Sequence, residues 1–293
     1  MVAEMTPLSG KSHKVLVTGA RGMLGRELCK ALSAAHEVRG VDIEDFDLTD
    51  AAAARKALAA ERPQVVVNCA AWTDVDGCER DPGRAFLHNG WGTWNLAKAA
   101  ADIGAALVHL STDFVFDGAK GEPYTEFDLP NPLSAYGASK LAGEEAVRSM
   151  VPHHYIVRSA WLFGSHGPNF VRTILETSAE REEIRVVADQ FGSPTYTRDL
   201  ARGLAEIILA GRVVPGTYHM VNSGVCSWAE LAAEALRLAR RPARVNPVPA
   251  AEWPSPAPRP AYSALRSRRL ELQGIPGLRD WREALTGYIE ESS

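Results

Sequence analysis

The stretch Val15-Leu-Val-Thr-Gly19-Ala-Arg-Gly22-Met-Leu-Gly25 decides the fold. Its apolar start predicts a buried strand, and the helical spacing of apolar residues over 23–34 predicts a helix directly after it. The glycines between them predict a tight turn, where backbone amides and the helix N-terminus can face a pyrophosphate. The spacing G-x-x-G-x-x-G differs from the usual G-x-G-x-x-G fingerprint, and a turn without a ligand is the alternative. The residues expected at a dinucleotide are Gly19, Arg21, Gly22, Met23, Leu24 and Gly25.

Beyond this turn, short apolar runs alternate with alanine-rich helical stretches. Strands are expected at 38–41, 65–68, 107–111 and 155–159, and helices at 51–60, 85–103 and around 136–140. This alternation predicts an α/β fold with a Rossmann-type, doubly wound parallel sheet. Further strands are expected at 184–187 and 217–221, and further helices at 197–209 and 228–240.

The proline-rich segment 242–260 is expected to be an extended loop of a smaller lobe rather than part of a sheet. We assign residues 1–162 to an NAD(P)-binding domain, to which 190–222 returns. Residues 163–189 and 223–293 are assigned to a smaller, C-terminal substrate-binding lobe.

Composition excludes several classes of protein. A chain of 293 residues can form one large α/β domain with a smaller lobe. The net charge of −4 provides no general attraction to nucleic acid or to an anionic membrane. No run approaches the roughly 18 consecutive apolar residues of a membrane-spanning helix, and residues 1–13 lack the apolar core of a secretory signal. The four cysteines form no C-x-x-C pair, so we expect reduced thiols, no zinc site and a cytoplasmic location.

An acidic residue follows the second predicted strand. Asp42 is placed to accept hydrogen bonds from the adenosine ribose, although capping a turn is its alternative role. Glu44 follows, and no Arg or Lys occurs before Arg55, so a 2′-phosphate would meet negative charge and NADH is favoured over NADPH. Other residues expected to contact the cofactor are Asp47 and Leu48 beside the adenine and Cys69, Ala70 and Ala71 after the third strand.

Tyr136 and Lys140 are four residues apart in a predicted helix, so their side chains share one face. A tyrosine alone is a poor acid–base catalyst at neutral pH, because its ordinary pKa is about 10. A lysine cation close by favours the phenolate, and we expect it to lower that pKa. The spacing alone is also typical of an ordinary surface pair. As a functional pair, it predicts proton transfer to or from an oxygen atom.

Taken together, the glycine turn, Asn68-Cys-Ala-Ala71, Ser111-Thr-Asp113 and Tyr136-x-x-x-Lys140 resemble the extended short-chain dehydrogenase/reductase superfamily. Longer blocks are similar to the dTDP-4-dehydrorhamnose reductase family over about residues 14–195, with a fainter match at Arg259-Pro260. These blocks are 68–76, 111–118, 136–144, 158–161 and 189–195. The resemblance implies NAD(P)H-dependent reduction of the C4 ketone of dTDP-4-dehydro-L-rhamnose to dTDP-L-rhamnose, the last step of dTDP-L-rhamnose biosynthesis.

The resemblance also implies residue roles. Tyr136 would protonate the C4 oxygen, Lys140 would bond the nicotinamide ribose and lower the tyrosine pKa, and Thr112 would hold the substrate oxygen. Asn89 is expected near the cofactor, with an exposed helical asparagine as the alternative. Trp161 is expected to face the sugar, with a core aromatic at the lobe interface as the alternative. The full set implied to bind the sugar nucleotide is Thr73, Val75, Asp113, Phe116, Trp161, Asn169 and Gln190.

The chain departs from the family pattern at several positions. Phe114 stands where the family usually has a tyrosine, and Cys69 replaces a more typical alanine. Two glycines in 88–92 destabilise a helix by roughly 1 kcal/mol each. Three alternatives therefore stay open: another nucleotide-deoxysugar 4-ketoreductase, an epimerase, or a non-catalytic protein similar to the regulatory subunit of methionine adenosyltransferase. The sequence also leaves open a bound Mg²⁺ and a homodimer, for which Arg26 and Glu27 are a candidate patch.

Overall fold

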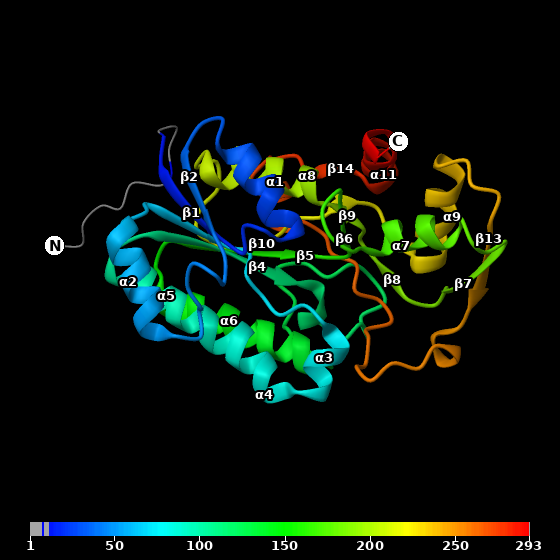
Figure 1. The fold of residues 1–293 in the computed structure, drawn as a ribbon, viewed down its shortest axis with the longest axis horizontal. Helices are drawn as coiled ribbons and strands as arrows, with labels where there is room; N and C mark the ends of the chain where they lie inside the picture. Colours follow the sequence, from blue (N-terminus) through cyan, green and yellow to red (C-terminus); the bar gives the residue numbers. More distant parts are fainter. Residues whose placement is uncertain (1–7, 9–11, 293) are drawn as a thin grey trace.

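A six-stranded parallel sheet forms the centre of the computed structural model, which describes residue 8 and residues 12–292 (Figure 1). Every neighbouring pair of strands is parallel, and the strand order is β10-β5-β4-β3-β1-β2. The doubly wound sheet predicted from the sequence is confirmed. Its strands are β1 (Lys14–Thr18), β2 (Glu37–Val41), β3 (Val65–Asn68), β4 (Ala106–Thr112), β5 (His154–Ser159) and β10 (Gly216–His219).

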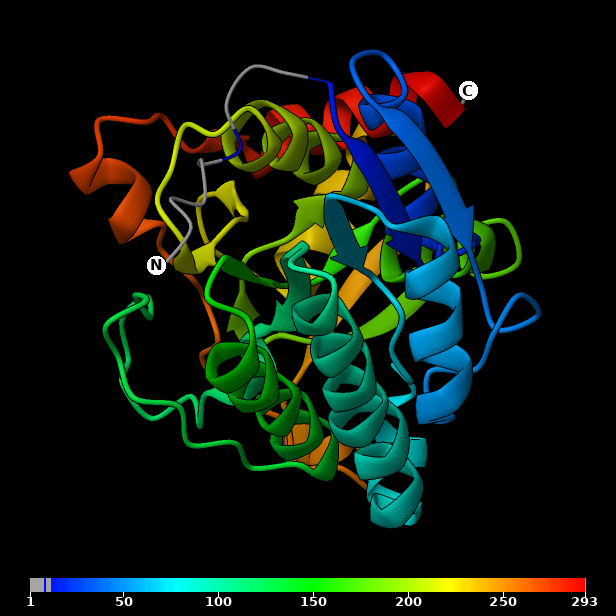
Figure 2. The same cartoon turned by 90° about the vertical axis from the view of Figure 1, so that its left-hand side faces the viewer.

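Helices cover both faces of this sheet, which explains why its inner strands are continuously apolar (Figure 2). Side chains alternate between the two faces of a strand. Val15 therefore packs with Leu28 in one core cluster, whereas Leu16 packs with Leu96 in the other. The first face is covered by α1 (Met23–Leu32), α8 (Thr197–Gly203) and the π-helical η3 (Leu204–Leu209), and the second by α2 (Ala51–Glu61), α5 (Thr93–Asp102) and α6 (Ala135–Met150).

The region predicted as one helix over 85–103 is divided in the structure. Two short helices, α3 (Val75–Arg80) and α4 (Pro82–Ala85), precede the π-helix η1 (Phe86–Gly92), which continues into α5. A Cβ added at Gly143 of α6 would lie 2.6 Å from the carbonyl oxygen of Asn89. Glycine at this position therefore allows the backbones of α6 and η1 to approach closely, and the widened π turn lies at that contact.

The remaining elements flank the carboxyl ends of the sheet strands or pack on the helical layer. Short strand pairs are β6 (Leu162–Phe163) with β9 (Thr195–Tyr196), β8 (Phe191–Gly192) with β12 (Cys226–Ser227), β11 (Asn222–Ser223) with β14 (Leu278–Asp280), and β7 (Glu183–Val187) with β13 (Arg244–Val248). The helices are α7 (Phe170–Thr177), α9 (Trp228–Leu238), α10 (Arg268–Leu272) and α11 (Trp281–Ser292), with the short 3₁₀ turns η2 (Asp113–Val115) and η4 (Ala250–Glu252).

The expectation that 242–260 forms only extended loop is wrong at β13. This strand pairs in parallel with β7, and Pro247 lies opposite Val186. Proline has no N–H and is tolerated in a strand at a sheet edge, where one side makes no ladder hydrogen bonds. Since the β7–β13 sheet has only two strands, β13 is such an edge strand.

Candidate active site

The glycine turn after β1 is shaped by close backbone contacts. Gly19 has φ of 66°, in the left-handed region, and a Cβ there would lie 2.7 Å from the amide nitrogen of Ala70. A Cβ at Gly25 would lie 2.1 Å from the carbonyl oxygen of Gly19. No side chain caps α1 at Gly22. The first-turn amides of Met23, Leu24 and Gly25 thus form a helix N-terminus suited to an anionic group.

A cavity of about 340 Å³ opens beside this turn, at the carboxyl ends of β1, β2 and β3. Most of the predicted cofactor residues line it: Gly19, Gly22, Asp42, Asp47, Leu48, Cys69, Ala70 and Ala71. It is also lined by Trp72, Arg84 and His88, which the sequence reasoning missed. Arg84 lies over the Trp72 ring at 4.6 Å, a contact between segments that no sequence motif indicates. Its place beside the glycine turn and its mixed polar and apolar lining suit part of a dinucleotide, whereas Thr112, Tyr136 and Lys140 do not line it.

The acidic end of β2 has a cation beside it. The Asp42 carboxylate accepts a hydrogen bond from the backbone amide of Arg21 at 2.9 Å, and the Arg21 guanidinium pairs with Glu44 at 2.7 Å. The linear sequence suggested no basic residue before Arg55. The glycine turn instead brings Arg21 to this position, so part of the negative charge that would oppose a 2′-phosphate is compensated.

The predicted catalytic residues meet at the end of β4. Thr112 ends β4, Asp113 follows in η2, and Tyr136 lies in the first turn of α6, which Ser134 caps. The hydroxyls of Thr112 and Tyr136 are hydrogen-bonded, and Thr112 Oγ1 donates to Asp113 at 3.1 Å. All three side chains are buried. Because β1, β3 and β4 are parallel, this cluster lies at the same edge of the sheet as the cavity beside the glycine turn.

The structure corrects the expected protonation of Tyr136. Burial raises the pKa of its phenol, the Thr112 hydrogen bond opposes the rise, and the Asp113 charge adds to it. Lys140 is not among the groups that shift this pKa, so the lowering expected from it is not found in this structure. Phe114 contributes to this burial, with its ring edge-on to Tyr136 at 5.7 Å. A raised pKa keeps the phenol as an O–H group at neutral pH, which suits a proton donor.

Lys140 is held on the same face of α6 as Tyr136. Its Nζ donates to the carbonyl oxygen of Leu110 at 2.7 Å, and only 3% of the residue is exposed. Burial lowers the pKa of its ammonium to about 8, whereas the negative charge of Glu144 acts to raise it. Lys140 is thus a buried ammonium one helical turn after Tyr136 and hydrogen-bonded to Leu110, with a pKa close to physiological pH.

The predicted sugar-binding residues are placed in different surroundings. Thr73 is exposed, and Val75 packs in a small cluster with Cys78, Ala85 and Tyr136. Asp113 is 2% exposed and accepts from Ser263 at 2.5 Å, and burial raises its pKa to about 6. Ser263 lies far along the chain, and no motif indicated it.

Trp161 has φ of 47°, and its ring stacks on Trp228 with the two centroids 3.4 Å apart. A Cβ at Gly192 would lie 2.3 Å from the Trp161 ring, so glycine is needed beside it. One side of this indole is therefore occupied by Trp228, and its half-buried ring lies between the sheet and the smaller elements.

The last three residues predicted to bind the sugar are Phe116, Asn169 and Gln190. Phe116 has no exposed surface, and its ring stacks on Tyr124 at 4.2 Å. The Asn169 side chain caps α7 and donates to the carbonyl oxygen of Gly164 at 2.9 Å. Gln190 is half-buried just before β8. The Phe116 backbone amide donates to the carbonyl oxygen of Asp113 at 3.0 Å, which joins it to the Thr112–Tyr136 cluster. Among the described residues, no recorded hydrogen bond or ring contact joins Asn169 or Gln190 to that cluster.

Asn89 is fully buried, so the alternative of an exposed helical asparagine does not apply. Its side chain accepts from the Trp72 amide at 2.8 Å and donates to the Trp72 carbonyl and to Ser139, both at 3.0 Å. Asn89 therefore fixes the backbone at Trp72, which lines the cavity, and links it to α6. Its three hydrogen bonds are made to protein groups.

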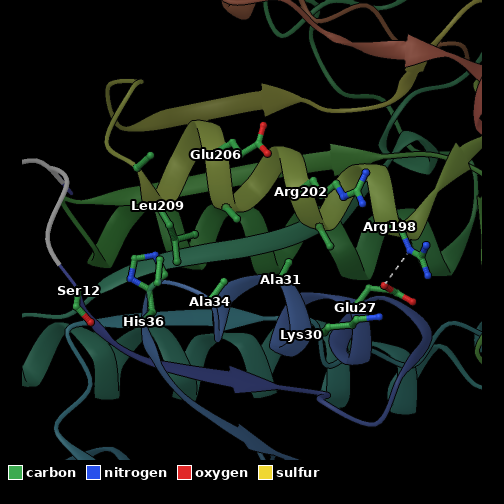
Figure 3. A pocket seen from close by; sticks show the side chains of 14 residues that line it. Ser12, Glu27, Lys30, Ala31, Ala34, His36, Arg198, Arg202, Glu206 and Leu209 are labelled. Atoms are coloured by element: carbon green, nitrogen blue, oxygen red, sulfur yellow. Dashed lines mark ion pairs between the residues drawn. The ribbon is translucent and has the colours of Figure 1, made fainter.

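A larger cavity of about 600 Å³ lies between α1 and the α8–η3 helix, as Figure 3 shows. None of the predicted site residues lines it. Glu27 lies at one end, only 5% exposed, with Arg198 at 3.6 Å and His166 at 3.5 Å. Glu27 is thus buried and paired within its own chain, so it does not form an exposed patch with Arg26 as the sequence suggested.

Within residue 8 and 12–292, no group of three or more His, Cys, Asp or Glu side chains is arranged to hold a metal ion. No helix in that part of the chain has both the length and the apolar character needed to span a bilayer.

Comparisons with known proteins agree with this geometry. The model of the RmlD substrate binding domain family matches residues 13–293. A dTDP-4-dehydrorhamnose reductase of Streptomyces griseus is 47% identical over 277 residues, which are 92% of this chain and 91% of that protein. A probable dTDP-4,6-dihydroxy-2-methyloxan-3-one 4-ketoreductase of Streptomyces antibioticus is 46% identical over 275 residues, 92% of each chain.

Among solved structures, that of dTDP-4-dehydrorhamnose reductase from Bacillus anthracis in complex with NADP superposes with a TM-score of 0.93 at 39% identity. The match covers 96% of this chain and 99% of that one. The family resemblance expected from the sequence motifs is confirmed. The chain belongs to the RmlD substrate binding domain family, together with these dTDP-4-dehydrorhamnose reductases.

Proposed function

We propose that this protein reduces the C4 ketone of dTDP-4-dehydro-L-rhamnose to dTDP-L-rhamnose. The observation that carries the proposal is the buried Thr112–Tyr136 hydroxyl pair, at the same edge of the sheet as the cavity beside the glycine turn. A bound nicotinamide dinucleotide supplies the hydride. Its candidate ligands are the residues of the glycine turn, Asp42, Asp47, Leu48 and the Cys69–Ala71 segment, with Tyr136 and Lys140 at the reactive end.

The chain's own residues account for the proton. Tyr136 holds a phenolic proton at neutral pH because burial raises its pKa. It donates that proton to the ketone oxygen as negative charge develops there. Thr112, hydrogen-bonded to the same phenol, holds the substrate oxygen in reach and stabilises the charge. The Lys140 ammonium adds positive charge at this edge and anchors the cofactor ribose.

For the cofactor, we propose that Asp42 favours NADH and that Arg21 allows NADPH to bind as well. Asp42 lines the cavity, and its carboxylate is held by the Arg21 amide. The Arg21 guanidinium lies beside Glu44, where it can turn toward a 2′-phosphate. The NADP in the Bacillus anthracis structure supports the acceptance of NADPH.

We also propose the boundaries of two domains and a cellular location. Residues 1–162 with 190–222 form the dinucleotide-binding domain, supported by β10 pairing with β5. Residues 163–189 and 223–293 form the substrate lobe, supported by shared packing of α7, α9 and α11. A cytoplasmic location is supported by four free cysteines among the described residues.

A second candidate is a 4-ketoreductase for another dTDP-sugar, which the Streptomyces antibioticus relative favours. The test measures oxidation of NADH and NADPH with dTDP-4-dehydro-L-rhamnose and a panel of other dTDP-4-ketosugars. Tyr136→Phe is expected to lose turnover by roughly a hundredfold or more and to keep cofactor binding. Tyr155→Phe, a buried phenol in the sheet core, is the control.

Highest kcat/KM for the rhamnose precursor supports the proposal. A preference for another ketosugar supports the second candidate instead. Product formation without net cofactor oxidation indicates an epimerase, and cofactor binding without any turnover indicates a non-catalytic protein.

A further inference from the structure

A buried network of polar side chains joins α6 to β4 and β5 directly behind the candidate active site. Glu144, with no exposed surface, lies one helical turn after Lys140. Its carboxylate accepts from Ser111 Oγ at 2.5 Å and from the Arg158 guanidinium at 2.9 and 2.7 Å. The proposed chemistry uses Lys140 but gives no role to these three residues.

Lys140 needs an opposing charge because it is buried. Burial alone lowers its pKa, and its recorded hydrogen bond goes to a neutral carbonyl, that of Leu110. Of the titratable groups that face it, Cys69 stays a neutral thiol because burial raises its pKa. His109 on β4 stays neutral because burial and Lys140 hold its pKa far below the ordinary value. Glu144 is the carboxylate that favours the charged lysine.

The Glu144 carboxylate is held by contacts from two arginines and a serine. Arg158 on β5 is 2% exposed and makes a bidentate contact with the Glu144 carboxylate. The guanidinium of the partly exposed Arg148 lies 3.4 Å from the same carboxylate. Ser111, which immediately precedes Thr112 on β4, donates to the same carboxylate. The network therefore fixes α6 against the strand that bears Thr112, and it fixes a negative charge one turn from Lys140.

We propose that Glu144 is a positioning residue that keeps the Lys140 ammonium charged and oriented toward the bound cofactor at neutral pH. This inference rests on the proposed function, in which Lys140 contacts the dinucleotide. It assigns the buried Ser111–Glu144–Arg158 contacts an electrostatic purpose in addition to their packing role. Removing the charge of Glu144 while preserving its shape should then weaken cofactor binding at alkaline pH before it affects binding at acidic pH.

The test is a fluorescence titration of NADPH binding to the whole protein between pH 6 and pH 10, with Glu144→Gln. The wild type should lose affinity as pH rises through the pKa of Lys140, about 8. In the variant this transition should move down by about one pH unit, the displacement typical of a lost neighbouring charge. Glu145→Gln is the matched control, because Glu145 is the adjacent, exposed carboxylate on α6.

An unshifted transition in folded Glu144→Gln overturns the inference, and so does an equal shift in Glu145→Gln. A purely structural role would lower the melting temperature without moving the transition. If Glu144→Gln does not fold, Glu144→Gln/Arg158→Met removes both members of the ion pair, so that Arg158 is not left buried without its carboxylate. The same downward shift is expected there, and its absence overturns the inference. Absence of NADPH and NADH binding by the wild type instead refutes the proposed function.

Discussion

Asp113→Asn is expected to stabilise the fold at alkaline pH while impairing activity. Asp113 is 2% exposed, and burial raises its pKa from 3.8 to about 6, against the hydrogen bonds from Ser263 and Thr112. An ionised carboxylate at this position therefore destabilises the folded chain. A rise of roughly two pH units corresponds to about 3 kcal/mol, at about 1.4 kcal/mol per unit. Asparagine keeps an acceptor oxygen and loses the charge, so a net gain of about 1–3 kcal/mol is expected above pH 7.

The sign of the pH dependence follows from linkage. Between about pH 4 and pH 6 the folded wild type binds more protons at Asp113 than the unfolded chain does, so its stability falls as pH rises through that window. Asparagine has no such transition. The advantage of the variant should therefore be small at pH 4, grow to pH 6 and stay constant above it.

The assay is urea unfolding of both proteins at pH 4.5, 6 and 8, with activity measured in parallel. Ser263→Ala is a useful comparison, because it removes one donor to the carboxylate and keeps the charge. It should lower stability at pH 8. Equal unfolding free energies of Asp113→Asn and wild type at pH 8, or a gain that shrinks as pH rises, would refute the reasoning.

Four further substitutions test other parts of the site. Gly25→Ala places a Cβ 2.1 Å from the Gly19 carbonyl, so NADPH affinity measured by titration should fall at least about tenfold, and unchanged affinity would contradict the turn geometry. Asp42→Ala should raise the ratio of kcat/KM for NADPH over NADH and Arg21→Ala should lower it, whereas shifts in the same direction would refute their opposed roles. Trp228→Ala removes the ring stacked on Trp161, so KM for the sugar nucleotide should rise several-fold with cofactor affinity unchanged, and equal loss of both would indicate general disruption.

The sheet could be predicted because its physical signal is local. β1, β3, β4 and β5 are covered on both faces, so each appears as a short apolar run followed by a turn. The segment 242–260 could not be read in this way. Its strand β13 has a single partner strand and mostly exposed side chains, so it has no continuous apolar run. Pro247 also argues against a strand, because proline is uncommon inside strands.

Site residues could be predicted where a sequence motif coincides with the end of a strand or the start of a helix, as at Thr112 and Tyr136. Properties that depend on burial or on contacts between distant segments could not be predicted in this way. The sequence placed a cation beside Tyr136 but did not reveal that the phenol would be buried against Phe114, which reverses the expected direction of its pKa. Likewise, Arg21 and Glu44 meet only because the glycine turn folds back toward β2.

The most direct test of the central claim follows a labelled hydride. The protein is incubated with dTDP-4-dehydro-L-rhamnose and NADH or NADPH that carries deuterium in turn at each C4 position of the nicotinamide, and the sugar product is examined by NMR and mass spectrometry. We predict dTDP-L-rhamnose with one deuterium at sugar C4 for one of the two labelled positions, one oxidised cofactor per product, and almost no product with Tyr136→Phe. Unlabelled product with both cofactor labels, or full turnover by Tyr136→Phe, would contradict it.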